Sequence, residues 1–141
     1  MKLKNISFMV ISMLLVMVLL AGCGEKGDPL IRVGIQGTKD TVEFDENKVI
    51  EDQAAVKEFK SIIADAHTEA NAASVQEAEI DKPYIAIIDN RDGKSLTVWL
   101  NLWLQRDGSV LFNKKRSGDS RYFLLDHKAG ARVKQLLALK R

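Results

Sequence analysis

The clearest chemistry in this sequence is that of a thiol near the N-terminus. Cys23 is the only cysteine of the 141 residues and directly follows the Leu-Ala-Gly of residues 20–22. Two lysines, Lys2 and Lys4, and a mostly apolar stretch at 6–20 precede it. A basic start, an apolar stretch too short to span a bilayer comfortably and small residues before a cut are typical of an export signal. A cysteine after such a cut is where bacterial lipoproteins receive a diacylglyceryl group, which predicts lipid attachment at the Cys23 thiol.

The export signal divides the chain into three parts. We expect residues 1–22 to be the signal peptide, residues 23–29 to be the lipidated cysteine with a short tether, and residues 30–141 to form a single domain. Six tether residues reach at most about 20 Å, so the domain is expected near the outer face of the bacterial cytoplasmic membrane, with membrane-proximal partners. The alternatives are an uncleaved membrane anchor and a non-lipid secretory signal. Both leave a lone cysteine at this position unexplained.

The formal charge argues against a nucleic-acid partner. Without residues 1–22 the chain carries 19 basic and 19 acidic side chains, because the signal removes two lysines and no acid. Residues 23–81 hold 14 acids and 6 bases, whereas residues 82–141 hold 5 acids and 13 bases. We expect the two halves to attract each other on packing, with an acidic or basic interaction surface as the alternative. The chain has no basic stripe with interleaved aromatics of the kind that binds nucleic acid.

Groups suited to catalysis are sparse. Once Cys23 carries lipid, two histidines remain, His67 and His127, each expected near a helix end. Three aspartates at predicted hairpin ends would have to converge to act as the paired carboxylates of a glycoside hydrolase: Asp89, Asp92 and Asp107. Acidic residues in turns usually serve the turn itself. The sequence therefore predicts no catalytic residue, no metal site and no cofactor.

Aromatic side chains on one predicted strand form the first candidate binding surface. Trp99, Asn101 and Trp103 alternate with apolar residues, so they share one face of the strand, and the two tryptophans lie about 13 Å apart. Two tryptophans beside an amide suit the anchoring of a partner protein or the stacking of sugars. The alternative is that they cover a second small core, under the N-terminal strands or the segment 68–79, because tryptophan is usually well buried.

Basic residues of a later hairpin form the second candidate surface. These residues are Lys114, Lys115, Arg116 and Arg121. Near a membrane, each such charge contributes about 1 kcal/mol of attraction to anionic headgroups. The hairpin therefore suits anionic lipid headgroups or an anionic envelope polymer, with a solvated loop as the alternative.

Residue periodicity predicts the elements that must position these side chains. Asp52 and Asp126 are good N-caps, and apolar residues at helical spacing follow each, which predicts two amphipathic helices. Alternating residues predict strands at 30–36, 41–44, 84–88, 95–105, 109–113 and 121–125. We expect residues 45–47 to break the second strand, and residues 68–79 to extend the first helix or form a long loop.

The order of these elements sets the fold class. Short hairpin connections in the second half imply antiparallel pairing. The expected fold is α+β: strand, strand, helix, a four-strand meander and a helix, with mainly antiparallel pairing and both helices packed on one face of the sheet.

The layout also resembles a family. An export signal with Cys23, early strands, a capped helix, the meander around "LTVWLNLWLQRDGSVLF" and the closing "RYFLLDHKAGARVKQLL" are similar to small lipoproteins of Bacillus and relatives, the YhfM-like family being the nearest. The resemblance implies a Gram-positive lipoprotein. It implies no activity and no functional residue, because none of these motifs is a catalytic signature.

These observations favour a membrane-anchored extracytoplasmic lipoprotein that acts as a non-enzymatic binding module. The expected partners are the membrane, through the lipid on Cys23, and a membrane-proximal or envelope protein. The alternatives are a binder of anionic envelope polymer or lipid headgroups and, less favoured, a small cell-wall hydrolase.

Overall fold

The computed structural model describes residues 27–38, 41–71, 73–76, 81–91, 96–115 and 121–140. The expected signal peptide, Cys23 and the first tether residues lie outside this range. No helix within it is long and apolar enough to cross a membrane. In chain order the elements are β1 (Pro29–Gln36), β2 (Val42–Ile50), α2 (Gln53–Ala64), β3 (Tyr84–Asn90), β4 (Leu96–Leu104), β5 (Val110–Lys114), β6 (Tyr122–Leu125) and α4 (His127–Leu136).

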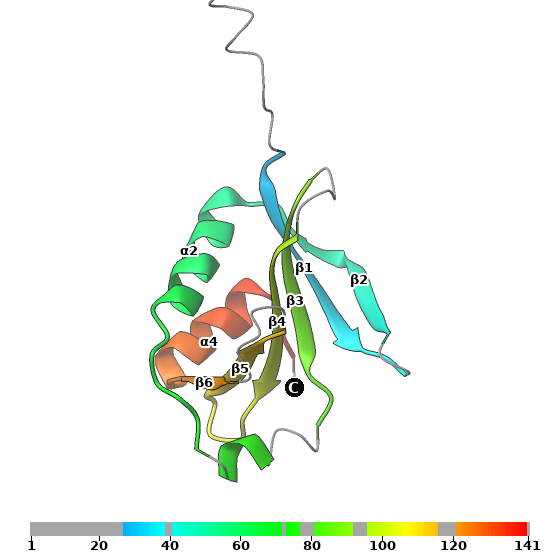
Figure 1. Cartoon of the computed structure of the whole chain (residues 1–141). Helices are drawn as coiled ribbons and strands as arrows, with labels where there is room; N and C mark the ends of the chain where they lie inside the picture. The colour runs from blue at the N-terminus through cyan, green and yellow to red at the C-terminus, as the bar shows by residue number, and fades with distance from the viewer. Residues whose placement is uncertain are drawn as a thin grey trace, which may run out of the picture.

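The six strands form one sheet with the order β2-β1-β3-β4-β5-β6, and every neighbouring pair is antiparallel. Helices α2 and α4 lie side by side on one face of this sheet, and β2 forms the edge at the right of the view in Figure 1. The predicted α+β class, the order of its elements and the packing of both helices on one face are thereby confirmed.

Both predicted helix starts are capped as expected. The Asp52 side chain accepts a hydrogen bond from the amide of Ala55 at 2.7 Å, and the Asp126 side chain accepts one from the amide of Ala129 at 2.8 Å. Each carboxylate satisfies an amide that the first helical turn leaves without an intrahelical partner. These caps fix where α2 leaves β2 and where α4 leaves β6.

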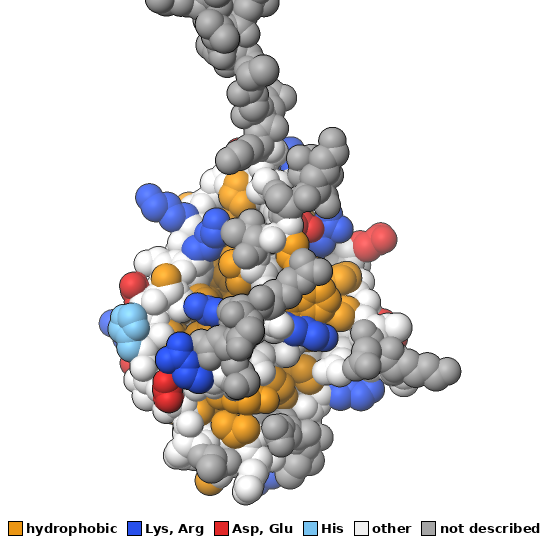
Figure 2. All heavy atoms as spheres, in the orientation of Figure 1, with side chains coloured by type: hydrophobic (Ala, Val, Ile, Leu, Met, Phe, Trp, Pro, Cys, Tyr) orange, Lys and Arg blue, Asp and Glu red, His pale blue; other side chains and the backbone are white. Residues whose placement is uncertain are grey.

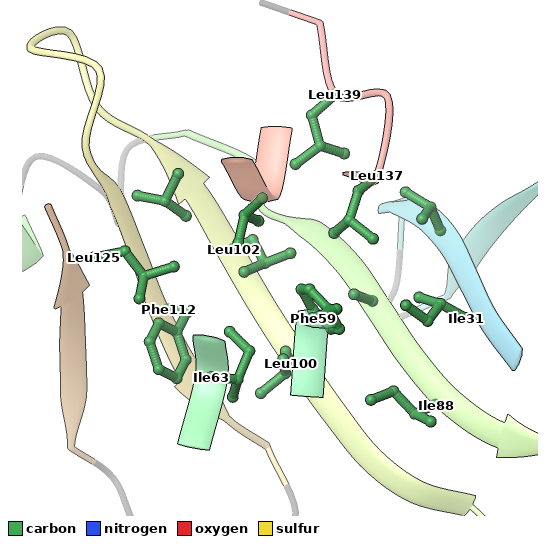
Figure 3. Close-up of a cluster of buried hydrophobic side chains, with 14 of the residues drawn as sticks. Ile31, Phe59, Ile63, Ile88, Leu100, Leu102, Phe112, Leu125, Leu137 and Leu139 are labelled. Carbon is green, nitrogen blue, oxygen red and sulfur yellow. The ribbon is translucent and has the colours of Figure 1, made fainter. Parts of the chain in front are cut away.

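The main core lies between the helices and the sheet (Figure 3). On β4, Leu100 and Leu102 are fully buried and face the helices, as their alternation predicts. From α2, Phe59 and Ile63 point onto the same strands. The core is completed from the other strands and from α4 by Ile31, Val33, Ala86, Ile88, Val110, Phe112, Leu125, Val133 and Leu137.

The second strand is longer than predicted. Instead of breaking at 45–47, β2 continues to Ile50, because a register shift against β1 places its extra residues opposite Val33. Such a bulge absorbs extra residues while the strand continues. Polar turn-like residues therefore occupy an irregular strand segment here, and this prediction was wrong.

In its described part, the segment 68–79 neither extends α2 nor forms only a loop; residue 72 and residues 77–79 lie outside the described residues. The chain leaves the helix after Ala64, and Glu69 then bridges to Phe123 of β6 in antiparallel fashion. The amide of Ala70 donates to the carbonyl of Tyr122 at 2.9 Å, and the amide of Leu124 donates to the carbonyl of Thr68 at 2.8 Å. Residues 73–76 then form a single helical turn. The stretch 68–70 thus occupies the outer edge of β6.

Candidate functional site

The structure does not place the two tryptophans on one exposed surface. Trp103 is only 7% exposed, and it packs with Leu111, Tyr122 and Ala70 in a second, smaller core. Its indole Nε1 donates a hydrogen bond to the carbonyl of Asp81 at 3.1 Å. Trp103 therefore belongs to the alternative that the sequence left open, a core covered by the connection between α2 and β3.

Asn101 and Trp99 lie on the same sheet face as Trp103 and are half-buried. The amide of Asn101 donates to Asn113 Oδ1 on β5 at 2.9 Å, so it is engaged within the sheet. The Lys115 ammonium lies 5.1 Å from the ring centroid of Trp99, a cation–π contact. Asn101 and Trp99 are thus both in contact with side chains at the end of β5 or directly after it.

A row of side chains crosses this face from the sheet edge to Trp99. Paired residues of neighbouring antiparallel strands share a face, and the register joins Val49 to Arg32, Arg32 to Ile87, and Ile87 to Trp99. Arg32 Nε lies 3.4 Å from Asp89 Oδ2 in an ion pair. Within the described part of the chain, three buried atoms lack a hydrogen-bond partner: Arg32 Nε, Asp89 Oδ1 and Trp99 Nε1.

The basic hairpin does not present its charges together. Lys114 and Arg121 both lie over the ring of Phe123, at 6.0 and 5.4 Å from its centroid, whereas Lys115 lies over Trp99 on the other face. Arg121 also pairs with Glu69 at 3.1 Å. Arg116 lies outside the described residues. On the face seen in Figure 2, lysine and arginine side chains are likewise scattered, not gathered in one patch.

The carboxylates proposed for a hydrolase do not meet. Asp89 pairs with the first residue of β4, whereas Asp107 follows its last residue, so β4 separates them by about 30 Å. Asp92 lies outside the described residues. Asp107 accepts hydrogen bonds from the hydroxyl and amide of Ser109, at 2.6 and 2.9 Å, and these bonds lower its pKa, with a smaller contribution from the charge of His127. This carboxylate serves the turn between β4 and β5.

The two histidines lie near opposite helix ends, His67 after the end of α2 and His127 at the start of α4. His67 is exposed beside a pocket of about 340 Å³ that α2, α4 and β6 line, mainly with apolar side chains. Asp126, which also lines it, already caps α4. His127 lies against Gly108 at the start of α4. Among the described residues, no three His, Cys, Asp or Glu side chains are grouped as metal ligands would be.

The exposed apolar surface lies elsewhere, on the β1–β2 hairpin. In the described part of the chain, three large hydrophobic residues are exposed: Ile35 at 48%, Phe44 at 39% and Val49 at 38%. Phe44 pairs with Gly34, and a Cβ on Gly34 would come within 3.0 Å of the Phe44 ring. The same Cβ would lie 2.7 Å from the backbone carbonyl oxygen of Glu43, so a side chain at position 34 would disturb both the β2 backbone and Phe44.

Sequence reasoning missed this surface. The alternation of residues 41–44 was recognised, but alternation assigns residues to faces and does not tell which strand lies at the edge of the sheet. The available signal was the acidic, turn-like composition of residues 45–47 between apolar residues, since charged residues are common on edge strands. The hairpin combines exposed apolar side chains with carboxylates at that edge.

The fold and this surface define an α+β domain with a six-stranded antiparallel sheet, two helices on one face and an apolar, acidic hairpin at one edge. No protein-family model, curated protein or solved structure matches the chain.

Proposed function

We propose that this protein is a non-enzymatic binding module, anchored by lipid at Cys23 to the outer face of the bacterial cytoplasmic membrane, and that it binds another protein through the β1–β2 hairpin. The observation that supports this most directly is the exposure of Phe44 and Val49, whose β1 partners Gly34 and Arg32 place both side chains on one face of the hairpin; Ile35 is exposed on the opposite face. Exposed apolar residues that lie near one another are characteristic of interaction sites. The proposed family, YhfM-like, stays a prediction from the sequence.

A protein fits this surface better than a small molecule does. The hairpin projects from the sheet at the side away from both helices (Figure 1). Small ligands bind in concave sites of about 300–1,000 Å³ that enclose most of their surface. The hollow that Phe44 lines measures only about 240 Å³, and Val49 does not line it. A partner protein can cover an open strand, and its aromatic and aliphatic residues supply the matching contacts.

The alternative, a binder of anionic polymer or headgroups, receives less support. Lys114 and Lys115 contact rings on opposite faces of the sheet, so the two lysines do not present their charges to one surface. Arg121 is engaged with Glu69. Hydrolysis receives less again, because Asp89 and Asp107 lie at opposite ends of β4.

The test is site-specific photo-crosslinking in cells, with the full chain and the crosslinking residue at position 49. We expect one dominant crosslinked protein, identified by mass spectrometry. The matched control carries the crosslinker at Lys57, which is also exposed but lies on α2. Equal products from positions 49 and 57, or none from position 49, would contradict binding through the hairpin.

A further inference from the structure

The two edges of the sheet differ in whether their outward backbone groups are hydrogen-bonded to another segment. At the β6 edge, Thr68 and Ala70 take up the outward backbone groups of Leu124 and Tyr122. At the β2 edge, no described segment pairs with the strand on its outer side. Building on the proposed function, we infer that β2 binds its partner by strand addition, and that the partner segment is extended, with alternating basic and apolar residues.

The alternation of hydrogen-bonded and non-hydrogen-bonded pairs along the hairpin shows which backbone amides and carbonyls of β2 point outward. The amide of Gly37 donates to the carbonyl of Thr41 at 2.9 Å, which makes these two a hydrogen-bonded pair. Because hydrogen-bonded and non-hydrogen-bonded pairs alternate in an antiparallel ladder, Glu43 turns its amide and carbonyl toward Ile35, whereas Phe44 turns these groups outward. The outward groups thus belong to a residue whose side chain is also exposed.

The same alternation of inward and outward backbone groups can be followed past the bulge opposite Val33. β1 pairs with β3 without a register shift from Pro29 to Ile35, so its residues keep their alternation along this length. Arg32 therefore directs its backbone groups to β3, and its partner Val49 directs its own groups outward. An incoming strand meets outward backbone groups at Phe44 and at Val49, with both side chains on one face.

The charges of β2 select the partner. The strand carries Glu43, Asp45 and Glu46 against the single base Lys48. Glu43 pairs with Ile35, on the face opposite Phe44. Opposite charges in cross-strand pairs are stabilising, so a partner strand fits when it places basic residues on the Glu43 face and apolar residues on the Phe44 face.

A hollow on the hairpin offers a seat for one of the partner's basic side chains. Its volume is about 240 Å³, and Ile35 and Tyr84 line it together with Glu43, Asp45 and Lys48. Lys48 pairs with Asp45 at 3.8 Å, so Glu43 is the carboxylate that an incoming base would meet. Lysine and arginine lay their apolar stems along apolar surface and keep the charged head at polar groups. The hollow offers both an apolar wall for the stem and carboxylates for the charged head.

A second copy of this chain fits the edge less well than a basic strand. Two β2 strands side by side would bring the Glu43, Asp45 and Glu46 carboxylates of one molecule to those of the other. Like charges placed opposite each other destabilise a strand pair. The charges of β2 therefore favour a different, basic chain.

The experiment measures binding of a labelled, end-blocked ten-residue peptide that alternates lysine and valine to the purified full chain in non-ionic detergent. The comparison peptide has glutamate in place of lysine. We expect binding of the lysine peptide alone. Val49→Pro removes the outward amide, which an edge strand tolerates, and should weaken binding about fivefold or more relative to Val49→Ala, which keeps the amide. Glu46→Lys should weaken it as well, whereas Asp65→Lys, the same change of charge at the exposed end of α2, should not.

Four results would overturn the inference. These are equal binding of the glutamate peptide, equal affinity of the Val49→Pro and Val49→Ala proteins, dimerisation of the wild-type chain that Val49→Pro abolishes, and no lysine-peptide binding although position 49 crosslinks to a partner in cells. The last result leaves the proposed function standing. If Val49→Pro fails to fold by circular dichroism, a lysine peptide N-methylated at alternate residues replaces it. The methylated peptide must then bind more weakly than its parent, and equal binding overturns strand addition.

Discussion

Arg132 of α4 donates two hydrogen bonds to the carboxylate of Glu58 on α2, from Nε to Oε1 at 2.6 Å and from Nη2 to Oε2 at 2.7 Å. The same guanidinium reaches Gln135 Oε1 at 2.8 Å. The fork geometry of arginine matches a carboxylate in this way. The contact joins the two helices through residues 74 positions apart in sequence, and both side chains are partly exposed.

This pair makes stability depend on pH. The hydrogen bonds from Arg132 lower the pKa of Glu58 below its ordinary value of 4.5, its charge adds to the lowering, and burial opposes both. A carboxyl group whose pKa is lower in the folded than in the unfolded state adds to the free energy of unfolding. This contribution is complete above the unfolded pKa and is lost as the pH falls through the folded pKa. We expect Glu58→Gln to lower the free energy of unfolding at pH 7 and to lower it less at pH 3, which is below the ordinary pKa. Urea denaturation at both pH values measures this. Glu46→Gln, which removes an exposed carboxylate, is the control, and an equal loss for Glu58→Gln at pH 3 would contradict the assignment.

Gly130 tests how closely α4 approaches the sheet. A Cβ there would lie 3.1 Å from the carbonyl oxygen of Gly108 and 3.1 Å from the amide nitrogen of Val110, both backbone atoms. Alanine normally favours a helix over glycine by about 1 kcal/mol, but overpacking against backbone costs about 1–3 kcal/mol. We therefore expect Gly130→Ala to be destabilising by about 1 kcal/mol in urea denaturation. Ala131→Gly, at the exposed neighbouring position, calibrates the helix term alone, and a stabilised Gly130→Ala protein would show that the helix can retreat.

The two tryptophans should differ in their contribution to stability. Trp103→Phe leaves the carbonyl of Asp81 without its indole donor and opens space in the second core, so we expect a loss of about 1–3 kcal/mol. Trp99→Phe removes an indole N–H that has no hydrogen-bond partner and weakens the contact with Lys115, which is worth about 0.5–1 kcal/mol. Chemical denaturation compares the two, and a larger loss for Trp99→Phe would be inconsistent with the burial of Trp103.

The cap of α4 gives a smaller, well-defined effect. Asp126→Ala removes the acceptor for the Ala129 amide, and loss of such a cap costs about 1 kcal/mol. Asp126→Asn keeps an acceptor and should retain most of the stability, which thermal denaturation at pH 7 can resolve. Equal losses for the two variants would assign the effect to charge at the helix start instead of to the hydrogen bond.

Lipid attachment is tested by Cys23→Ser in the producing cell. If the thiol is the acceptor, this variant loses the acyl mass and its retention in the membrane fraction after carbonate washing, while the folded domain is unchanged. Intact-mass measurement and fractionation record both. Ser12→Ala, within the apolar stretch, is the control. A Cys23→Ser mass that differs from that of the wild type only by the exchange of sulfur for oxygen would exclude lipid at this position.

The sequence predicted those parts of the fold that follow from local pattern. The alternation of β4 placed Leu100 and Leu102 in the main core, and both are fully buried. Asp52 and Asp126 cap their helices as expected. Such features depend on residues a few positions apart, so the residues themselves carry the information.

The parts that were missed depend on residues far apart. Alternation assigned Trp103 to one face of β4, but only the path of the chain after α2 brings Ala70 over it. The position of β2 at the edge follows from β3 pairing with β1, a contact across about 50 residues, which no local pattern reports. The candidate surface at Phe44 and Val49 was missed for the same reason.

The segment 68–70 along β6 has a consequence for assembly. Because these residues occupy the β6 edge, β2 is the one open edge of the described sheet. Among the described strands, a molecule that has paired through β2 offers no second open edge to the next, which opposes growth of a filament through the sheet. Edge-to-edge polymerisation of the described sheet is therefore opposed for as long as Thr68 and Ala70 keep their hydrogen bonds to β6.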